Sequence, residues 1–139
     1  MIYISLSEID TKKIARIIAK NSERGNIFCL EGELGSGKTF FVKEFAYAIG
    51  IKDYVSSPTF SIINEYHGPI NLYHFDAYRI SSIDEMEYTN YEDYFYGDGI
   101  CIIEWATIIK EIIPDFAKWI YFSKDLSRGE NYRSIKIID

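Results

Sequence analysis

The sequence predicts an α/β fold: a mixed, mostly parallel β-sheet flanked by helices, with an antiparallel hairpin portion. Residues 26–49 have the pattern of a buried apolar strand, a glycine-rich loop and an amphipathic helix. Residues 60–78 contain two strand-like runs around the turn residues 67–69, which predicts the hairpin. Residues 100–104 form a further apolar run that ends in an acid. Strands that alternate with helices in this way are typical of a sheet covered by helices.

Local signals indicate where the individual elements begin and end. Ser7, followed three residues later by Asp10, is a start signal for the first helix. Gly50 ends the second helix and Pro114 ends the last one. We expect strands at residues 2–6, 26–31, 60–66, 70–78, 100–104, 119–122 and 134–138, and helices at residues 7–21, 39–49, 84–88 and 107–113. No repeat or linker interrupts this order, so we expect a single domain over residues 1–139.

The glycine-rich loop, Gly-Glu-Leu-Gly-Ser-Gly-Lys-Thr at residues 32–39, matches the phosphate-binding pattern G-x-x-x-x-G-K-[ST]. Gly32, Gly35 and Gly37 lack a Cβ, so the backbone can adopt positive φ and approach phosphate oxygens closely. Lys38 supplies a positive charge to the outer phosphates, and Thr39 offers a hydroxyl to Mg²⁺. The start of a helix also favours anions. The loop therefore predicts a P-loop NTPase-like fold that binds a nucleoside triphosphate; the alternative is a glycine-rich turn with an accidental Lys-Thr.

Phosphate-loop enzymes also need an acid at the end of a neighbouring strand, opposite the loop. Glu104 follows the four apolar residues 100–103 and has this position. We expect Glu104 and Thr39 to hold the magnesium ion. An acid that ends an apolar strand is also common as a solvated residue, and Trp105 after it either belongs to the core or covers the site.

A third group of polar residues lies in the strand-like run 73–79. Period 2 places His74, Asp76 and Tyr78 on one face. Burying such a face is costly unless its groups are paired, so it is either a functional surface or the water-facing side of an edge strand. We expect Asp76 to act as a base that orients the attacking water or as a second acid on the magnesium side. Thr59, in a turn-forming segment, is a candidate sensor of the outer phosphate.

Charge and composition exclude several other classes of protein. The chain has 15 basic and 21 acidic side chains and a net charge of −6, which argues against direct binding of tRNA or other nucleic acid. Cys29 and Cys101 lie in apolar runs and are expected to be buried, reduced thiols. The sequence contains no signal peptide and no apolar stretch long enough to span a bilayer, so we expect no membrane association and a cytoplasmic location. The tyrosines between residues 66 and 96 form either a partner-binding face or half-buried filler.

Several motifs together resemble one family, the bacterial ATPase TsaE (YjeE) of tRNA threonylcarbamoyladenosine (t6A) biosynthesis. They are the glycine-rich loop, Ser-Pro-Thr-Phe at 57–60, Asn-Glu-Tyr at 64–66, His-Phe-Asp-Ala-Tyr-Arg at 74–79 and Glu-Trp at 104–105. The resemblance covers about residues 7–106. It implies an ATPase that hydrolyses ATP to ADP and phosphate with Mg²⁺ and acts on the partner proteins TsaD and TsaB.

The resemblance also implies which residues form the site. Lys38, Asp76 and Glu104 would be catalytic, and Thr39 and Glu104 would hold the metal. The remaining nucleotide-binding positions would be Thr11, near the base, Glu33, Gly35, Ser36, Gly37, Phe40, Thr59, in a sensing segment, and Arg133, near the phosphates. The sequence departs from the family at Thr89-Asn90, where Leu-Gly is usual, and at Ala106, where proline is common. Residues 110–139 match only loosely.

Two other functions remain open on the sequence. A small-molecule P-loop kinase usually has an arginine-rich lid, for which only Arg128 and Arg133 are present beyond Arg79. A non-catalytic, nucleotide-dependent binding module would bind a nucleotide through the loop without hydrolysing it. A GTPase is disfavoured because no Asn-Lys-x-Asp segment occurs.

Overall fold

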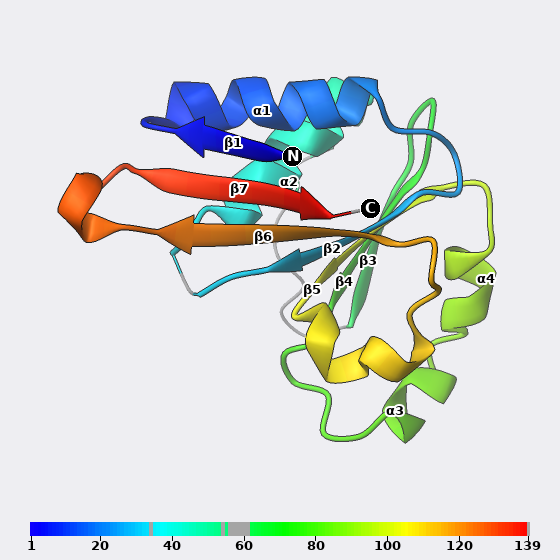
Figure 1. The fold of residues 1–139 in the computed structure, drawn as a ribbon. Coiled ribbons are helices and arrows are strands. Elements are labelled where there is room, and N and C mark those ends of the chain that lie inside the picture. The colour runs from blue at the N-terminus through cyan, green and yellow to red at the C-terminus, as the bar shows by residue number, and fades with distance from the viewer. Residues whose placement is uncertain (34, 54, 56–61, 139) are drawn as a thin grey trace.

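The computed structural model describes residues 1–33, 35–53, 55 and 62–138, and its strands form a seven-stranded sheet in the order β1-β7-β6-β2-β5-β4-β3 (Figure 1). The strands are β1 (Ile2–Ser5), β2 (Ile27–Glu31), β3 (Ile63–Tyr66), β4 (Leu72–Asp76), β5 (Ile100–Glu104), β6 (Lys118–Lys124) and β7 (Arg133–Ile138). Strands β4, β5, β2 and β6 pair in parallel. β3 is antiparallel to β4, and β7 is antiparallel to both β6 and β1. The prediction of a mixed sheet with an antiparallel hairpin is confirmed.

The two long helices lie on one face of the sheet, as Figure 1 shows. They are α1 (Glu8–Lys20) and α2 (Lys38–Ala48). Ser7 caps α1 as the sequence predicts, because its Oγ accepts a hydrogen bond of 3.2 Å from the Asp10 amide. No helix in this described part of the chain is long and apolar enough to cross a bilayer.

The opposite face is covered by short elements. They are α3 (Asp84–Glu87), α4 (Tyr91–Phe95) and the 3₁₀-helix η1 (Ala106–Ile112); a second 3₁₀-turn, η2 (Leu126–Arg128), joins β6 to β7. The sequence predicts one helix between residues 81 and 98, whereas the structure has two. The five-residue helix α4 is too short for a periodic signal, and it follows Asn90, whose φ of 56° is left-handed. Asn is one of the few residues besides glycine that adopt this conformation readily.

The alternation of side chains along the strands produces two cores. Phe28 and Leu30 of β2 face α1 and α2, whereas Ile27 and Cys29 face α4 and η1. All five residues of β5 are buried, as expected of a strand at the centre of a sheet covered on both faces. The central strands are thereby covered on both faces, and the sheet places the residues that follow them.

Both cysteines are buried, reduced thiols, as predicted. Cys29 and Cys101 are 0% and 1% exposed and form no disulfide. Burial disfavours the thiolate and raises the pKa of Cys101 from 9.0 to about 12. Burial also raises the pKa of Cys29, and the carboxylate of Glu31 adds to that effect.

We therefore predict that neither thiol reacts with Ellman's reagent in the native protein at pH 8, whereas both react at once in urea. The folded state retains the thiol protons and the unfolded chain loses them above about pH 9. The free energy of unfolding should consequently fall as pH rises from about 9 toward 12, and less so in a variant with both cysteines changed to alanine. Native thiols that react as fast as those of the unfolded chain would contradict the assignment.

Candidate functional site

The glycine-rich loop joins the end of β2 to the start of α2. Gly37 precedes the helix in a left-handed conformation, with φ of 100°, and a Cβ at this position would meet no atom of the described residues within 4 Å. At Gly32 a Cβ would lie 2.6 Å from the carbonyl oxygen of Phe122, so this position accepts glycine alone without a shift of β6. The predicted need for glycines in the loop is confirmed, and the backbone at Gly37 is open to a ligand.

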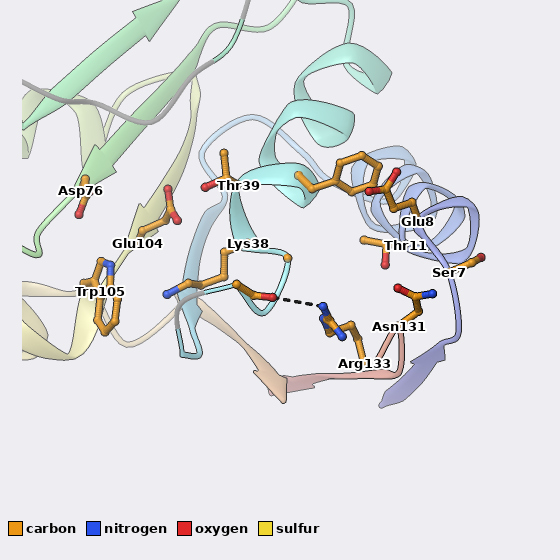
Figure 2. Close-up of a pocket in the computed structure, with 13 residues that line it drawn as sticks. Ser7, Glu8, Thr11, Lys38, Thr39, Asp76, Glu104, Trp105, Asn131 and Arg133 are labelled. Atoms are coloured by element: carbon orange, nitrogen blue, oxygen red, sulfur yellow. Dashed lines mark hydrogen bonds between the residues drawn. The ribbon is translucent and has the colours of Figure 1, made fainter. Parts of the chain in front are cut away.

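A cavity of about 390 Å³ lies beside this loop, at the ends of β2, β4 and β5 from which their chains exit (Figure 2). It is lined by Ser7, Glu8, Thr11, Gly35, Gly37, Lys38, Thr39, Phe40, Asp76, Glu104, Trp105, Asn131 and Arg133. The ends of parallel strands are where α/β proteins with open sheets bind their ligands.

Lys38 is nearly buried at the centre of the site. Its Nζ donates to the carbonyl oxygen of Gly32 at 2.5 Å and lies 3.8 Å from the centre of the Trp105 ring. Burial lowers the pKa of Lys38 below 10.5, while the carboxylates of Glu104, Glu31 and Asp76 oppose that shift, in decreasing order. The ammonium group is thus partly desolvated and faces acids, an arrangement suited to an incoming anion only if further positive charge accompanies it.

Glu104 and Asp76 end neighbouring strands and are direct partners in the parallel register of β5 and β4. Asp76 Oδ1 accepts a hydrogen bond of 3.0 Å from the Tyr78 amide, which orients this carboxylate. Glu104 is buried, and its Oε2 lies 2.6 Å from Nε2 of the fully buried His74. β4 lies inside the sheet, flanked by β3 and β5, so the reading of residues 73–79 as an edge strand with a water-facing polar side is wrong.

Trp105 is followed by a turn that is held by an interaction without a signal in the sequence. Trp105 has a left-handed backbone, with φ of 58°, which is unusual for a bulky residue. The next turn is held by Glu31, whose Oε1 accepts from the Thr107 amide at 2.6 Å and from its hydroxyl at 2.8 Å. The ring of Tyr78 packs against the ring of Trp105, and the two ring centres lie 5.0 Å apart. Glu31 and Thr107 lie 76 positions apart, and no local pattern links them.

The side of the cavity away from Trp105 is formed by α1 and the segment before β7, as Figure 2 shows. Arg133 Nη2 donates to the Gly35 carbonyl oxygen at 3.2 Å and ties β7 to the loop. Thr11 is buried, and its Oγ1 lies 2.6 Å from the Ser5 hydroxyl. Ser7, Glu8 and Asn131 also line this side and were not predicted. In the sequence, Ser7 and Glu8 indicate only the start of a helix. Asn131 lies in a polar loop without a motif.

The predicted site residues fall into three groups. Those that line the cavity are Thr11, Gly35, Gly37, Lys38, Thr39, Phe40, Asp76, Glu104 and Arg133. Ser36 is 1% exposed within the loop, whereas Glu33 is exposed and is not among the residues that line the cavity. Thr59 lies outside the residues that the structure describes.

The residues present fit a phosphate chain with a metal ion. Ser36 Oγ is buried and has no hydrogen-bond partner within the described ranges, which is unusual unless a ligand supplies one. These ranges contain no cluster of three or more His, Cys, Asp or Glu side chains able to bind a metal by themselves. Mg²⁺ does not require such a cluster, because it commonly uses one or two protein oxygens and completes its shell with water and substrate phosphates. Thr39 and Glu104 can supply those oxygens.

The fold and the site define a class of protein. A strand, a glycine-rich phosphate loop and a helix at the centre of a mostly parallel sheet, with acids ending the adjacent strands, are the features of the P-loop NTPase fold. Within this class the chain belongs to the TsaE family, because residues 5–134 match the family model for the threonylcarbamoyl adenosine biosynthesis protein TsaE. The predicted resemblance is confirmed, and the protein is a member of a family involved in t6A biosynthesis on tRNA.

Individual relatives agree with this assignment. The chain is 47% identical over 106 residues to the tRNA threonylcarbamoyladenosine biosynthesis protein TsaE of Bacillus subtilis, an alignment that covers 76% of this chain and 66% of the relative, just under two thirds. It is 35% identical over 113 residues to the protein of the same name from Treponema pallidum, covering 81% and 84% of the two chains. The crystal structure of Bacillus subtilis YdiB superposes with a TM-score of 0.78 at 34% identity, over 99% of this chain and 83% of the other.

Proposed function

We propose that this protein is a Mg²⁺-dependent ATPase that hydrolyses ATP to ADP and phosphate and acts on a TsaD–TsaB complex in t6A modification of tRNA. The observation that carries the proposal is that Lys38, Thr39, Asp76 and Glu104 line one cavity beside the phosphate loop. Membership of the TsaE family supports the biological setting. Both ATP and the metal ion are inferred from the donor groups at the site.

The loop and Lys38 bind the phosphates in this proposal. Backbone amides of the loop, from Gly35 onward, donate to phosphate oxygens at the N-terminus of α2. Lys38 then exchanges the Gly32 carbonyl for an outer phosphate oxygen, and the gain in charge pairing offsets the cost of its burial. Ser36 gains the partner that its buried hydroxyl lacks among the described residues. Phe40 and Glu33 flank this segment and are assigned as secondary contacts.

The acids and Thr39 serve the chemical step. Thr39 and Glu104 hold the metal ion, and a bound Mg²⁺ neutralises charge on the phosphate oxygens. Asp76, oriented by the Tyr78 amide, accepts a hydrogen bond from the attacking water and aligns it with the outer phosphate. Lys38 stabilises the negative charge that develops on the transferred group.

The other side of the cavity would take the nucleoside. Thr11, Glu8 and Asn131 line it opposite Trp105 and provide hydroxyl, carboxylate and amide groups. Arg133, bonded to the loop carbonyl of Gly35, brings a second positive charge near the phosphates. Thr59, as a sensor of the outer phosphate, stays a prediction.

The partner proteins and the setting follow from the family rather than from a surface on this chain. The net charge of −6 suits a subunit that leaves tRNA contact to its partners. We propose a cytoplasmic location, where tRNA is modified, and a single ATPase domain over residues 1–139. A kinase function is less well supported, because Arg133 is engaged by the loop and Arg128 pairs with Asp125, so neither forms a lid over the phosphates.

The first prediction concerns the phosphate loop. Lys38→Ala should weaken ATP binding about 30- to 150-fold, which corresponds to the roughly 2–3 kcal/mol of a charged hydrogen bond. Isothermal titration calorimetry measures the affinity, and exposed Lys13→Ala in α1 serves as the matched control. Equal ATP affinity in the Lys38 variant and the wild type would remove the loop from the proposal.

The second prediction concerns Glu104. Glu104→Gln keeps an acceptor for His74 but loses the charge, so we expect ATP to bind nearly as before and Mg²⁺-dependent hydrolysis to fall by about 100-fold. Phosphate release is the measurement, and Glu111→Gln, at an exposed position, is the control. Full turnover by the Glu104 variant would show that its carboxylate is not used.

The third prediction separates an ATPase from a nucleotide-dependent binding module. Phosphate release from ATP should be slow for the isolated protein and rise at least about tenfold when TsaD and TsaB are added together, with water as the acceptor. Lys38→Ala should abolish that rise. If ATP binds with the partners present but no phosphate is ever released, the protein is a binding module.

A further inference from the structure

His74 and Glu104 form a buried polar pair on the face of the sheet that α2 covers. Their side chains are 0% and 5% exposed, and His74 Nε2 lies 2.6 Å from Glu104 Oε2. The contact is diagonal, because the strand register places His74 beside Ile102 and Asp76 beside Glu104. His74 therefore contacts the carboxylate from within the core. Glu104 itself also lines the cavity.

The surroundings of His74 indicate which ring nitrogen carries the hydrogen. An ionised carboxylate only accepts hydrogen bonds, so Nε2 must donate to Glu104. Nδ1 is buried and has no hydrogen-bond partner in the described part of the chain. Buried N–H groups without an acceptor are rarer in proteins than under-satisfied acceptors, so the tautomer with hydrogen on Nε2 and none on Nδ1 fits best. This ring orients Glu104 without cancelling its charge.

We propose that His74 is a positioning residue that fixes the Glu104 carboxylate for binding of the metal ion. The inference rests on the proposed role of Glu104 as a magnesium ligand. Held at Oε2 by a rigid ring in the core, the carboxylate keeps one rotamer and presents its other oxygen to the cavity. Hydrogen bonds from outside the ligand set commonly orient metal ligands in this way, and their loss costs about 10- to 100-fold in metal affinity.

A purely structural role and a positioning role for His74 predict different effects of substitution at this position. A structural residue would affect stability, and any substitution of similar size and polarity would serve alike. A positioning residue requires a donor at one place. The amide nitrogen of glutamine can occupy the position of Nε2, whereas the shorter asparagine places its nitrogen near Nδ1, out of reach of Glu104. His74→Gln and His74→Asn therefore form a matched pair.

The primary measurement is the Mg²⁺-dependent tightening of ADP binding, determined by calorimetry with and without the metal. We expect His74→Gln to keep the Mg²⁺ affinity within about threefold of the wild type and His74→Asn to weaken it about 10- to 100-fold. ADP affinity without metal should stay unchanged in both variants. Ile102→Val, a core change at the partner position of His74, controls for lost stability and should leave the Mg²⁺ response unaltered.

A double-mutant cycle tests whether His74 acts through Glu104. In a Glu104→Gln background, His74→Asn should cause no further loss of Mg²⁺ affinity.

The ¹⁵N chemical shifts of the His74 ring in the wild-type protein give a second test, which does not depend on whether any variant folds. These shifts should report hydrogen on Nε2 and none on Nδ1.

Each contrary outcome overturns the inference in a recognisable way. Equal Mg²⁺ affinities for the asparagine and glutamine variants, an additive loss in the Glu104→Gln background, or hydrogen on Nδ1 would each refute a positioning role while leaving the metal site intact. If Mg²⁺ fails to tighten ADP binding to the unmodified protein, the proposed metal site itself is wrong, and the role of His74 falls with it.

Discussion

Parallel pairing of β2 with β5 and of β5 with β4 is the constraint on which the site depends. It places Leu30 beside Glu104, and Glu104 beside Asp76, so that three strands end together. The loop that follows β2 thereby meets the acids that end the other two strands. A slip of β5 by one residue against its neighbours would turn Glu104 away from α2 and separate it from both Lys38 and His74. The four apolar residues of β5 oppose this slip, because each belongs to one of the two cores.

The balance of charges at the ends of these strands explains why the site suits an anion accompanied by a cation. Lys38 is desolvated, which lowers its pKa, and three carboxylates nearby oppose that shift. A triphosphate alone would pair with Lys38 but would also approach Glu104 and Asp76, which repel it. A divalent cation between phosphate and Glu104 converts that repulsion into attraction. The buried ammonium on one side and the acid on the other are thus two separate positions of opposite charge in the cavity, as the proposed binding of a phosphate chain with a metal ion requires.

Sequence patterns predicted the parts of the site that follow local rules. The loop, the cap at Ser7 and the acids that end β4 and β5 each depend on neighbours within a few residues, and the structure has them where expected. The bond between Glu31 and Thr107 depends on tertiary packing and has no sequence signal. The pairing of His74 with Glu104 was not predicted either, because the diagonal contact requires the strand order and register to be known.

The two cores cooperate in shaping the site, since its parts are supported from opposite faces of the sheet. His74 and Glu104 belong to the face covered by α2, whereas Glu31 and Thr107 lie on the face covered by η1. Trp105 stands between them in a left-handed conformation, which persists in proteins only where the surrounding structure holds it. Its ring lies 3.8 Å from Lys38 Nζ, and Glu31 holds the turn that follows it. The left-handed backbone at Trp105 is therefore flanked by contacts from both faces of the sheet, which place its ring beside Lys38.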